Sequence, residues 1–600
     1  MRKLRNAETI LGIIRERGTR GLPLDNVYRL LYNREFYLRA YNRIYRNKGA
    51  MTAGVTDETA DAMSLAKIDS IIEALRYERY RWKPVRRIYI EKRRSKKKRP
   101  LGLPPWSDKL LQEVIRSILE AYYEPQFSAH SHGFREGRGC HTALNTIYKT
   151  WIGTTWFIEG DIAQCYDSLD HALLLSILGE KIHDNRFLRL IENLLKAGYL
   201  ENWHFNATLS GVPQGSIVGP ILSNIYLDRL DKAVESELLP AYNQGERRGY
   251  NPAYLKLIQQ ARRLRKNGQP KAAQALRRKA QQLPSLDTTN PGYRRLRYCR
   301  YADDILLGFA GPREEAEKIK HHLGEVLQKL KLTLSEEKTT ITHARTDTAR
   351  FLGYEIHVLN NNQKRDKRGY RCINGQIGLK VPRAVVRAKT ETYQKHGEPQ
   401  ARPALLHNTT YTIVAHYQQE FRGLAEYYQL AYNLHQLNTL KWRMERSLVC
   451  TLSNKLHITV QQVYARFTTS IQTDHGPRKV LQVVVERGEG KPPLIAQWGG
   501  IRLARTQKAA YLDDDPHPIY NSHSELLERL LAQCCELCGS HDNIEVHHIR
   551  ALKDLKRKGR AERPKWVEIM AARRRKTLVL CHKCHKKVHA GEFDRSSGAK

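Results

Sequence analysis

The stretch RYCRYADDILLGFAG, residues 297–311, places two adjacent aspartates, Asp303 and Asp304, between two apolar runs. Bulky residues on both sides predict a strand–turn–strand hairpin with the aspartates at its turn. Two carboxylates in contact repel each other, and a metal ion is the usual positive charge that lies between them. The segment therefore predicts a hairpin that carries part of a metal centre.

A third carboxylate follows another predicted strand. In TTWFIEGDIAQCYDSLDH, residues 154–171, a run of bulky residues ends at Gly160 and Asp161 comes directly after it. Nucleotidyl transfer uses two divalent cations roughly 4 Å apart, and Mg²⁺ prefers oxygen ligands. Asp161, Asp303 and Asp304 are therefore candidate Mg²⁺ ligands of a nucleotidyltransferase.

Length and charge narrow the class of protein. The chain has 600 residues, which predicts several domains, and its formal net charge is +40 at pH 7. A positive excess of this size favours a long polyanion, nucleic acid, as the partner. The sequence contains no apolar run of the roughly eighteen residues that a membrane span needs and no signal-peptide pattern. We therefore expect no membrane partner and a cytoplasmic location.

Residues near the aspartates point to the substrate. An aromatic ring at Tyr166, beneath the sugar, would clash with a 2′-hydroxyl and select deoxynucleotides. Gln214 and Gly215 lie in a Gly/Pro-rich loop that offers an amide and backbone N–H groups to an incoming nucleotide. Lys338 follows two glutamates and is a candidate for phosphate contact or for protonating the leaving group. Arg99 belongs to a basic run suited to gripping a triphosphate.

Seven motifs in order resemble those of the reverse transcriptases. They are RPLGLP, SHGFREGRGCHTA, GDIAQCYDSLDH, GVPQGSIVGPILSNIYLDRLD, YADD, LSEEKTTI and FLGY, and the resemblance spans roughly residues 40–357. Together with NKGAMTAGVTDET near the N-terminus, they resemble more narrowly the bacterial-type group II intron-encoded proteins. The resemblance implies a multidomain α+β protein: a right-hand polymerase whose fingers and palm contain an antiparallel palm sheet, followed by an α-helical thumb.

The same resemblance assigns roles to residues of the polymerase. It implies that the three aspartates are the Mg²⁺ ligands and that Tyr166 is the sugar gate. It also implies that Arg99, with Lys92 or Arg93, is the contact of the fingers to phosphate.

The region after a polar linker resembles the maturase domain, which acts as the polymerase thumb. Its matching piece is FRGLAEYYQLAYN, and the resemblance implies binding to the parent intron RNA and help with RNA splicing. We expect most of its tyrosines, among them Tyr417, Tyr427 and Tyr428, to pack in the core rather than contact RNA.

The expected domains follow from these assignments. They are an N-terminal extension, 1–70; fingers and palm, 71–358, with a basic helical insertion at about 244–284; a maturase or thumb domain, 372–470; a DNA-binding region, 471–528; and a Cys/His domain, 530–600.

Half of the ten cysteines lie in the last seventy residues. CELC at 535–538 and CHKCH at 581–585 give two CxxC pairs, so Cys535, Cys538, Cys581 and Cys584 predict a closed tetrahedral Zn²⁺ site. A purely structural zinc ribbon would not account for the histidines nearby.

The order of cysteines and histidines resembles that of the HNH nucleases. The resemblance implies a small zinc-containing ββα domain with one catalytic metal ion, for which we expect Mg²⁺. His548 would be the general base that activates water, and His547, His585 and His589 would hold the metal. The central Asn of the family is absent, and Thr577 lies near its position, so a DNA-binding relic is the alternative to a working nuclease.

Together these resemblances imply a reverse transcriptase, maturase and DNA endonuclease that acts in intron mobility by target-primed reverse transcription. Its partners would be intron RNA, target DNA and deoxynucleoside triphosphates. Three alternatives stay open at this point: a splicing maturase with vestigial enzymatic sites, an RNA-dependent RNA polymerase, and a retron-like or defence reverse transcriptase.

Overall fold

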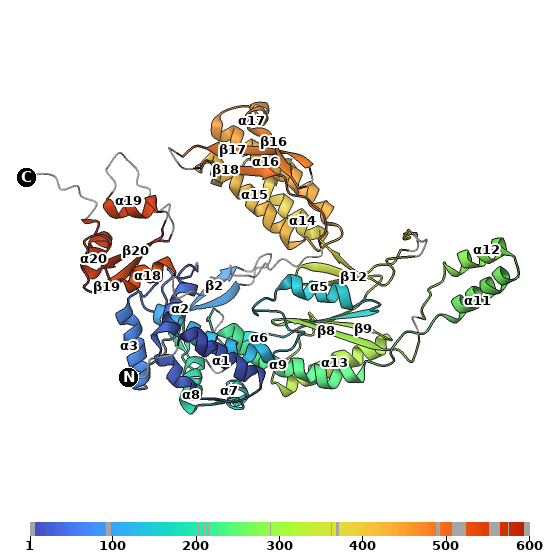
Figure 1. Ribbon diagram of the computed structural model, residues 1–600, viewed down its shortest axis with the longest axis horizontal. Coiled ribbons are helices and arrows are strands. Elements are labelled where there is room, and N and C mark those ends of the chain that lie inside the picture. The colour runs from blue at the N-terminus through green and yellow to red at the C-terminus, as the bar shows by residue number, and fades with distance from the viewer. Residues whose placement is uncertain are drawn as a thin grey trace, which may run out of the picture.

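The structure is a computed structural model with several bodies around a central sheet. It describes the following residues: 6–47, 49–91, 98–201, 204–208, 210–212, 215–287, 290–361, 363–367, 371–474, 476–487, 492–506, 524–550, 564–573 and 575–592. Three residues named above, Lys92, Arg93 and Gln214, lie outside these ranges. Figure 1 shows the palm at the centre, the thumb above it, the C-terminal domain at one end and a long helical hairpin at the other.

The palm sheet has four antiparallel strands in the order β10-β4-β9-β8, as the resemblance implied. The strands are β4 Trp156–Asp161, β8 Arg295–Tyr301, β9 Asp304–Ala310 and β10 Thr340–His343. In the β8–β9 hairpin Tyr301 pairs with Asp304, so Ala302 and Asp303 form the turn.

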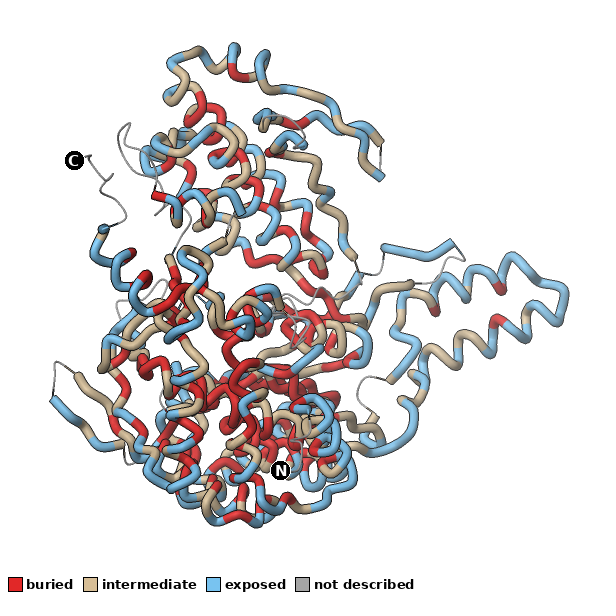
Figure 2. The backbone as a smooth tube through the Cα atoms, turned by 60° about the vertical axis from the view of Figure 1, so that its left-hand side comes forward, coloured by how far each residue is buried: buried red, intermediate tan, exposed pale blue. Residues whose placement is uncertain are grey.

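The two faces of the palm sheet belong to two different hydrophobic cores, because side chains alternate along a strand. Ile305, Leu307 and Phe309 of β9 join a core that extends through α9 and α13 into the fingers. Leu306 points to the other face, into a core shared with α5 and the thumb. Figure 2 shows the buried residues concentrated along this central layer. The helices are α5 Cys140–Thr150, α9 Gly219–Ala233 and α13 Arg313–Lys329.

The fingers combine helices with a second sheet of order β3-β2-β6-β7. The strands are β2 Val85–Glu91, β3 Lys98–Leu103, β6 Tyr199–Glu201 and β7 His204–Asn206. The helices are α1 Ala7–Thr19, α2 Arg34–Ile44, α3 Leu65–Arg76, α4 Trp106–Tyr123, α6 Cys165–Ser168, α7 His171–Gly179 and α8 Asn185–Leu195.

The thumb contains more than the helices expected over 372–470. A three-stranded sheet follows them, and its Trp498 is fully buried against Tyr417 and Phe421 of α15. The first half of the 471–528 segment is therefore part of the thumb core. Tyr417 and Tyr428 are buried, as expected. The elements are α14 Arg383–Thr390, α15 Thr410–Tyr427, α16 Leu437–Leu456, α17 Val460–Phe467, β16 Thr468–Thr473, β17 Gly476–Val485 and β18 Leu494–Gly499.

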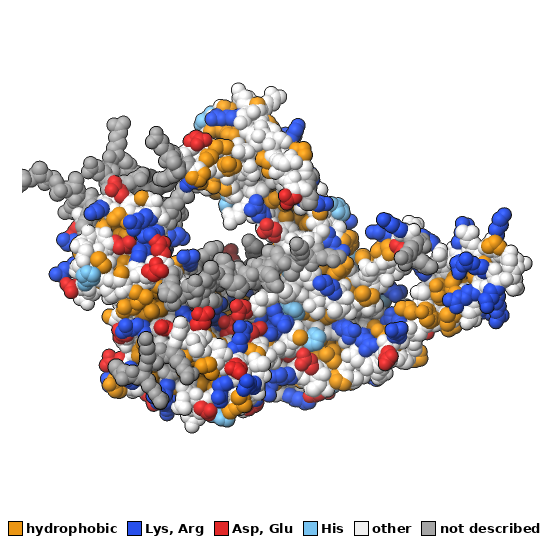
Figure 3. Space-filling view, viewed as in Figure 1, with side chains coloured by type: hydrophobic (Ala, Val, Ile, Leu, Met, Phe, Trp, Pro, Cys, Tyr) orange, Lys and Arg blue, Asp and Glu red, His pale blue; other side chains and the backbone are white. Residues whose placement is uncertain are grey.

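A three-stranded sheet links palm and thumb, and a helical hairpin extends away from the palm. The sheet has the order β11-β12-β13, with β11 Ala349–Phe351, β12 Tyr354–Val358 and β13 Ile377–Lys380. The hairpin is α11 Pro252–Lys266 and α12 Pro270–Ala280, in which only alanines are buried: Ala261, Ala273 and Ala280. Figure 3 shows Lys and Arg side chains gathered over its outer end.

The C-terminal domain is built on the β19–β20 hairpin, with α20 directly after β20, in the ββα order. Its apolar residues join the core of the fingers and the N-terminal extension. The elements are α18 Glu525–Leu531, β19 Ile544–His548, α19 Lys565–Ala572, β20 Thr577–Cys581 and α20 His582–Ala590. Among the described helices, none is long and apolar enough to cross a membrane.

Candidate functional site

The three aspartates of the palm meet at one end of the β4–β9 ladder. Asp161 ends β4 directly opposite Asp304, which begins β9, and Asp303 lies in the adjoining turn. Burial, together with the negative charges of Asp303 and Asp161, raises the pKa of Asp304 to about 6. A charge arrangement of this kind favours a bound cation, and a donor set made only of carboxylate oxygens suits Mg²⁺.

A lysine lies against this carboxylate group. Lys338 Nζ is 2.7 Å from Asp161 Oδ2. Its segment is held to the palm by the backbone, since the N–H of Ser335 donates to the Asp161 carbonyl at 2.8 Å. Lys338 therefore lies beside the aspartates and partly balances their charge.

Residues of the SHGFREG motif pack against the β8–β9 turn that holds Asp303. A side chain at Gly133 would come within 2.4 Å of the Ala302 backbone nitrogen, so this position admits only glycine. The guanidinium of Arg300, fully buried, donates to the Ala302 carbonyl at 2.8 Å and forms an ion pair with Asp231 at 2.5 Å. Ala302 itself has a φ of +55°. A strained turn persists only when its surroundings hold it in place.

Tyr166 lies on α6 beside the aspartates. Burial, and then the nearby charge of Asp303, raise its pKa, whereas the charge of Arg99 lowers it. The ring is therefore near enough to Asp303 and to Arg99 of β3 to be affected by both charges. Its backbone carbonyl accepts a hydrogen bond of 2.8 Å from the Val212 N–H, which ties the Gly/Pro-rich loop to α6.

Gly215 packs the Gly/Pro-rich loop against the fingers. Its φ is +106°, and a Cβ there would lie 2.5 Å from the carbonyl oxygen of Gly102 on β3. The close approach requires glycine. Val212 and Gly215 of the loop therefore contact α6 and β3, respectively. Gln214, predicted to contact the nucleotide, is outside the described residues.

The four predicted cysteines of the C-terminal domain converge. The Sγ atoms of Cys535, Cys538, Cys581 and Cys584 all lie within 4.8 Å of one another. Burial opposes the thiolate of Cys535, but backbone hydrogen bonds, first from Cys538, outweigh it and lower its pKa to about 7. The cluster is suited to holding a metal ion that prefers thiolates. Cys534, its neighbour in sequence, is not part of it.

A second cluster joins the predicted histidines His547, His585 and His589 to an aspartate that the sequence analysis missed. Asp61, from the N-terminal extension, completes a group whose ligand atoms lie within 4.8 Å of one another. Its carboxylate is 3.2 Å from His585 Nε2 and 2.8 Å from His589 Nε2. These are the two groups of this kind among the residues that the structure describes; the palm aspartates are spaced more widely.

His548, the predicted base, lies beside this cluster with its ring turned away from it. Its Nε2 is 2.7 Å from the hydroxyl of Tyr41, a buried residue of α2. Burial, the largest cause, lowers the pKa of His548 to about 4, so the ring is neutral near pH 7. Thr577, in place of the absent Asn, pairs directly with His548 across the β19–β20 ladder.

A basic cavity of about 640 Å³ adjoins His548. It lies between the N-terminal extension and the C-terminal domain, and its lining includes Arg46, Arg550, Arg573 and Lys576. A cavity with this many cations beside a neutral imidazole fits a phosphodiester.

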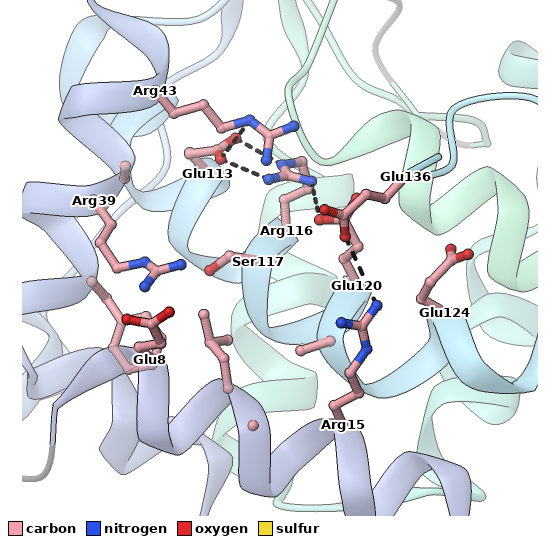
Figure 4. Close-up of a pocket in the computed structure, with 15 residues that line it drawn as sticks. Glu8, Arg15, Arg39, Arg43, Glu113, Arg116, Ser117, Glu120, Glu124 and Glu136 are labelled. Atoms are coloured by element: carbon pink, nitrogen blue, oxygen red, sulfur yellow. Dashed lines mark hydrogen bonds and ion pairs between the residues drawn. The ribbon is translucent and has the colours of Figure 1, made fainter. Parts of the chain in front are cut away.

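The N-terminal extension that supplies Tyr41 and Asp61 is held in place by charged groups. Figure 4 shows the pocket between α1, α2 and α4, where glutamates and arginines point toward one another. Arg116 is 2.8 Å from Glu113 and 2.6 Å from Glu120, and Arg43 of α2 is 3.3 Å from Glu113. We regard this pocket as structural, because its buried charges are paired with each other.

Known protein families match three successive parts of the chain. Three family models match: "Reverse transcriptase (RNA-dependent DNA polymerase)" over residues 90–356, "Type II intron maturase" over 382–485, and "AI2M/AI1M-like, HNH endonuclease" over 535–585.

Individual relatives cover almost the whole chain. The chain is 39% identical to the group II intron-encoded protein LtrA of Lactococcus lactis, over 94% of this chain and 95% of the relative. It is 34% identical to a 91 kDa protein in the cob intron of Schizosaccharomyces pombe, over 95% of this chain and 70% of the relative. It is 33% identical to the protein YkfC of Escherichia coli, over 56% of this chain and 84% of the relative.

Proposed function

This chain belongs to the group II intron-encoded proteins, with reverse transcriptase, maturase and HNH endonuclease domains, and on that premise we propose which residues carry each activity. We propose that Asp161, Asp303 and Asp304 hold Mg²⁺ for DNA synthesis on an RNA template. The observation that carries this proposal is the direct pairing of Asp161 with Asp304 beside the Asp303 turn.

Bound Mg²⁺ would supply a lowered pKa for the primer 3′-hydroxyl and charge stabilisation for the triphosphate. The palm aspartates orient the reacting groups through the rigid β4–β9 ladder. Lys338, 2.7 Å from Asp161, is in position to neutralise phosphate charge or to deliver a proton to the leaving group.

The walls of the nucleotide site come from α6, the Gly/Pro-rich loop and the fingers. Tyr166 selects the sugar by filling the space that a 2′-hydroxyl needs. Gly215 carries the backbone close to the nucleotide, with Gln214 beside it, and Arg99 contacts the triphosphate from β3. Two observations support these roles. Gly215 packs against Gly102, and the charge of Arg99 affects the pKa of Tyr166.

In the nuclease domain we propose two metal sites, one structural and one catalytic. The four cysteines would hold Zn²⁺, which would stabilise the fold around β20 and α20. His547, His585 and His589 hold the catalytic cation, and a set of imidazoles accommodates Mn²⁺ as well as Mg²⁺. His548 takes the proton from the attacking water, and the basic cavity beside it receives the DNA phosphodiester.

The remaining basic surfaces serve the nucleic-acid partners. We propose that the thumb and the α11–α12 hairpin bind intron RNA, and that the 471–528 segment contacts target DNA. A net charge of +40 supports contact with phosphates over a long surface. Nicked DNA then supplies the 3′-hydroxyl that primes copying of the intron RNA, and we expect this reaction in the cytoplasm.

Primer extension on an RNA template tests the polymerase. Wild type and Asp303→Ala are given Mg²⁺ and deoxynucleoside triphosphates, with Asp347→Ala, an exposed aspartate outside the site, as the matched control. We expect synthesis in wild type and control and none above background in Asp303→Ala. Absence of synthesis in all three, with tight RNA binding retained, would instead indicate a maturase with vestigial enzymatic sites.

A further inference from the structure

Asp61 reaches the nuclease domain because the N-terminal extension pairs with strand β19. The N–H of Ala62 donates to the Val546 carbonyl at 3.0 Å, and the N–H of Val546 donates to the Met63 carbonyl at 2.9 Å. Met63 and Val546 are both fully buried in the shared core. This pairing fixes the backbone of the extension next to His547 and His548, so the position of Asp61 follows from a rigid contact.

The Asp61 carboxylate is surrounded by groups of the nuclease domain. Its Oδ1 accepts a hydrogen bond of 2.7 Å from the backbone N–H of His548 and lies 3.2 Å from His585 Nε2. Its Oδ2 lies 2.8 Å from His589 Nε2. One carboxylate thus touches two of the three imidazoles proposed to hold the catalytic cation.

His547 supplies an independent observation that a ligand belongs in this cluster. Its side chain is buried, and neither Nδ1 nor Nε2 has a hydrogen-bond partner. Its Nδ1 is 3.5 Å from Asp61 Oδ1, and its ring lies near those of both His585 and His589, with centroids 5.2 and 5.0 Å away. A buried imidazole without partners is costly, and a cation between these rings would satisfy it.

A neighbouring carboxylate orients a second ring. Glu545 Oε2 lies 2.7 Å from His585 Nδ1, which places an N–H on Nδ1 and directs Nε2 into the cluster. Metal-binding histidines commonly donate their other N–H in this way. The Nε2 atom lies 3.2 Å from Asp61 and 3.1 Å from His589.

We propose that Asp61 is a direct ligand of the nuclease metal, so that the N-terminal extension of the polymerase completes the nuclease site. The inference rests on the proposed role of the histidines as metal ligands. The resulting set of three imidazoles and one carboxylate suits a divalent cation and still leaves coordination positions open for water and a DNA phosphate if the cation is octahedral.

An ion pair between Asp61 and protonated histidines is the competing interpretation. It would account for the contacts of Asp61 with His585 and His589, and for the 3.5 Å approach of His547 Nδ1 to Asp61. It would leave the buried Nε2 of His547 without a hydrogen-bond partner. A shared cation would engage all three rings and the carboxylate together.

Mn²⁺ binding followed by pulsed electron paramagnetic resonance tests the proposal. Mn²⁺ held by imidazole shows ¹⁴N couplings, which distinguish it from Mn²⁺ on the palm aspartates. The full-length wild type is titrated beside Asp61→Asn, with Asp57→Asn as the matched control, since Asp57 is an exposed aspartate of the same loop. His547→Ala reports whether the ¹⁴N signal comes from this cluster at all, and melting temperatures report folding.

We expect Asp61→Asn to weaken the ¹⁴N-coupled Mn²⁺ site at least about tenfold, with Asp57→Asn unchanged. Equal affinity, or tighter binding, in a folded Asp61→Asn would overturn the role of Asp61. If His547→Ala leaves the ¹⁴N signal intact, the proposed histidine site itself fails, and the proposal with it.

A second variant covers the case in which Asp61→Asn lowers the melting temperature. Asp61→Glu keeps the carboxylate one methylene further out. If Asp61→Glu binds Mn²⁺ more tightly than Asp61→Asn, the result supports ligation by the carboxylate. If Asp61→Glu binds Mn²⁺ no more tightly than Asp61→Asn, the result contradicts it.

Discussion

The proposed polymerase centre takes its three carboxylates from two neighbouring strands of one sheet and the turn beside them, whereas the proposed nuclease cluster joins residues up to 528 positions apart. Strand register alone brings Asp161 to Asp304. The nuclease needs a docked N-terminal extension to bring Asp61 and Tyr41 to its histidines. One centre is therefore a property of a local fold, and the other is a property of the assembled molecule.

Removal of the cysteine-bound metal should separate the two centres most completely. Cys581 is one of the four clustered cysteines and directly precedes α20, so Cys581→Ser should release the proposed Zn²⁺ and loosen the helix that carries His585 and His589. Structural zinc sites contribute folding free energy directly. We expect DNA nicking to be lost and primer extension to persist, measured on the same preparation. Nicking at the wild-type rate would show that the cysteine cluster is dispensable.

Asp161→Asn should stop synthesis. The change removes a proposed metal ligand and the charge partner of Lys338. Since a metal ion supplies several kcal/mol and each ~1.4 kcal/mol is tenfold, we expect a fall in kcat of roughly a thousandfold. Single-turnover primer extension measures it, with Asp347→Asn as control. A loss of only a few fold would mean that the β4 carboxylate is not a ligand.

Tyr166→Val should relax the choice of sugar without removing synthesis. The smaller side chain leaves room for a 2′-hydroxyl, so the preference for deoxynucleotides over ribonucleotides should fall by roughly a hundredfold. The ratio of kcat/KM values for the two triphosphates measures it. An unchanged ratio would place the sugar gate elsewhere.

Tyr41→Phe should slow the nuclease through the orientation of His548. The hydroxyl lost is the one 2.7 Å from His548 Nε2, and loss of an outer partner typically costs about tenfold or more. We expect kcat for nicking to fall while KM for DNA and the ¹⁴N-coupled Mn²⁺ affinity stay constant. The control is Tyr45→Phe, whose hydroxyl contacts Arg46 instead. Equal effects of both variants would indicate a general packing role.

Deletion of the α11–α12 hairpin should give the smallest effect. Arginines and lysines cluster in the last turns of both helices, and few residues are buried. We expect intron RNA to bind several-fold more weakly and with a shallower dependence on salt, while synthesis on a short primer–template is kept. Filter binding over a salt series measures this, and unchanged affinity would remove the hairpin from the RNA surface.

The two centres also differ in how much of each could be predicted from the sequence. Asp303 and Asp304 stand in a predicted hairpin turn and Asp161 ends a predicted strand, so they were recognised as candidate metal ligands, and the resemblance to reverse transcriptases implied the antiparallel palm. The cysteines were found from their spacing, and the histidines from the resemblance to HNH nucleases.

Asp61 had no such signal. In the segment VTDETADAMS nothing distinguishes it from Asp57, and only the pairing of Ala62 and Met63 with Val546 gives it a role. Tyr41 is likewise one of many tyrosines on amphipathic helices. The strands of the thumb, β16 to β18, were missed because 471–528 has weak periodicity, and burial of Trp498 is a tertiary effect.

Metal rescue of Asp303→Cys in primer extension tests the central claim, direct metal binding by the palm aspartates, most directly. A thiolate binds Mg²⁺ poorly but accepts softer cations such as Mn²⁺ or Cd²⁺. We expect Asp303→Cys to fail to extend a primer with Mg²⁺ and to regain synthesis with Mn²⁺ or Cd²⁺, while Asp347→Cys behaves as wild type with each metal. Synthesis by Asp303→Cys at the wild-type rate with Mg²⁺ would contradict it.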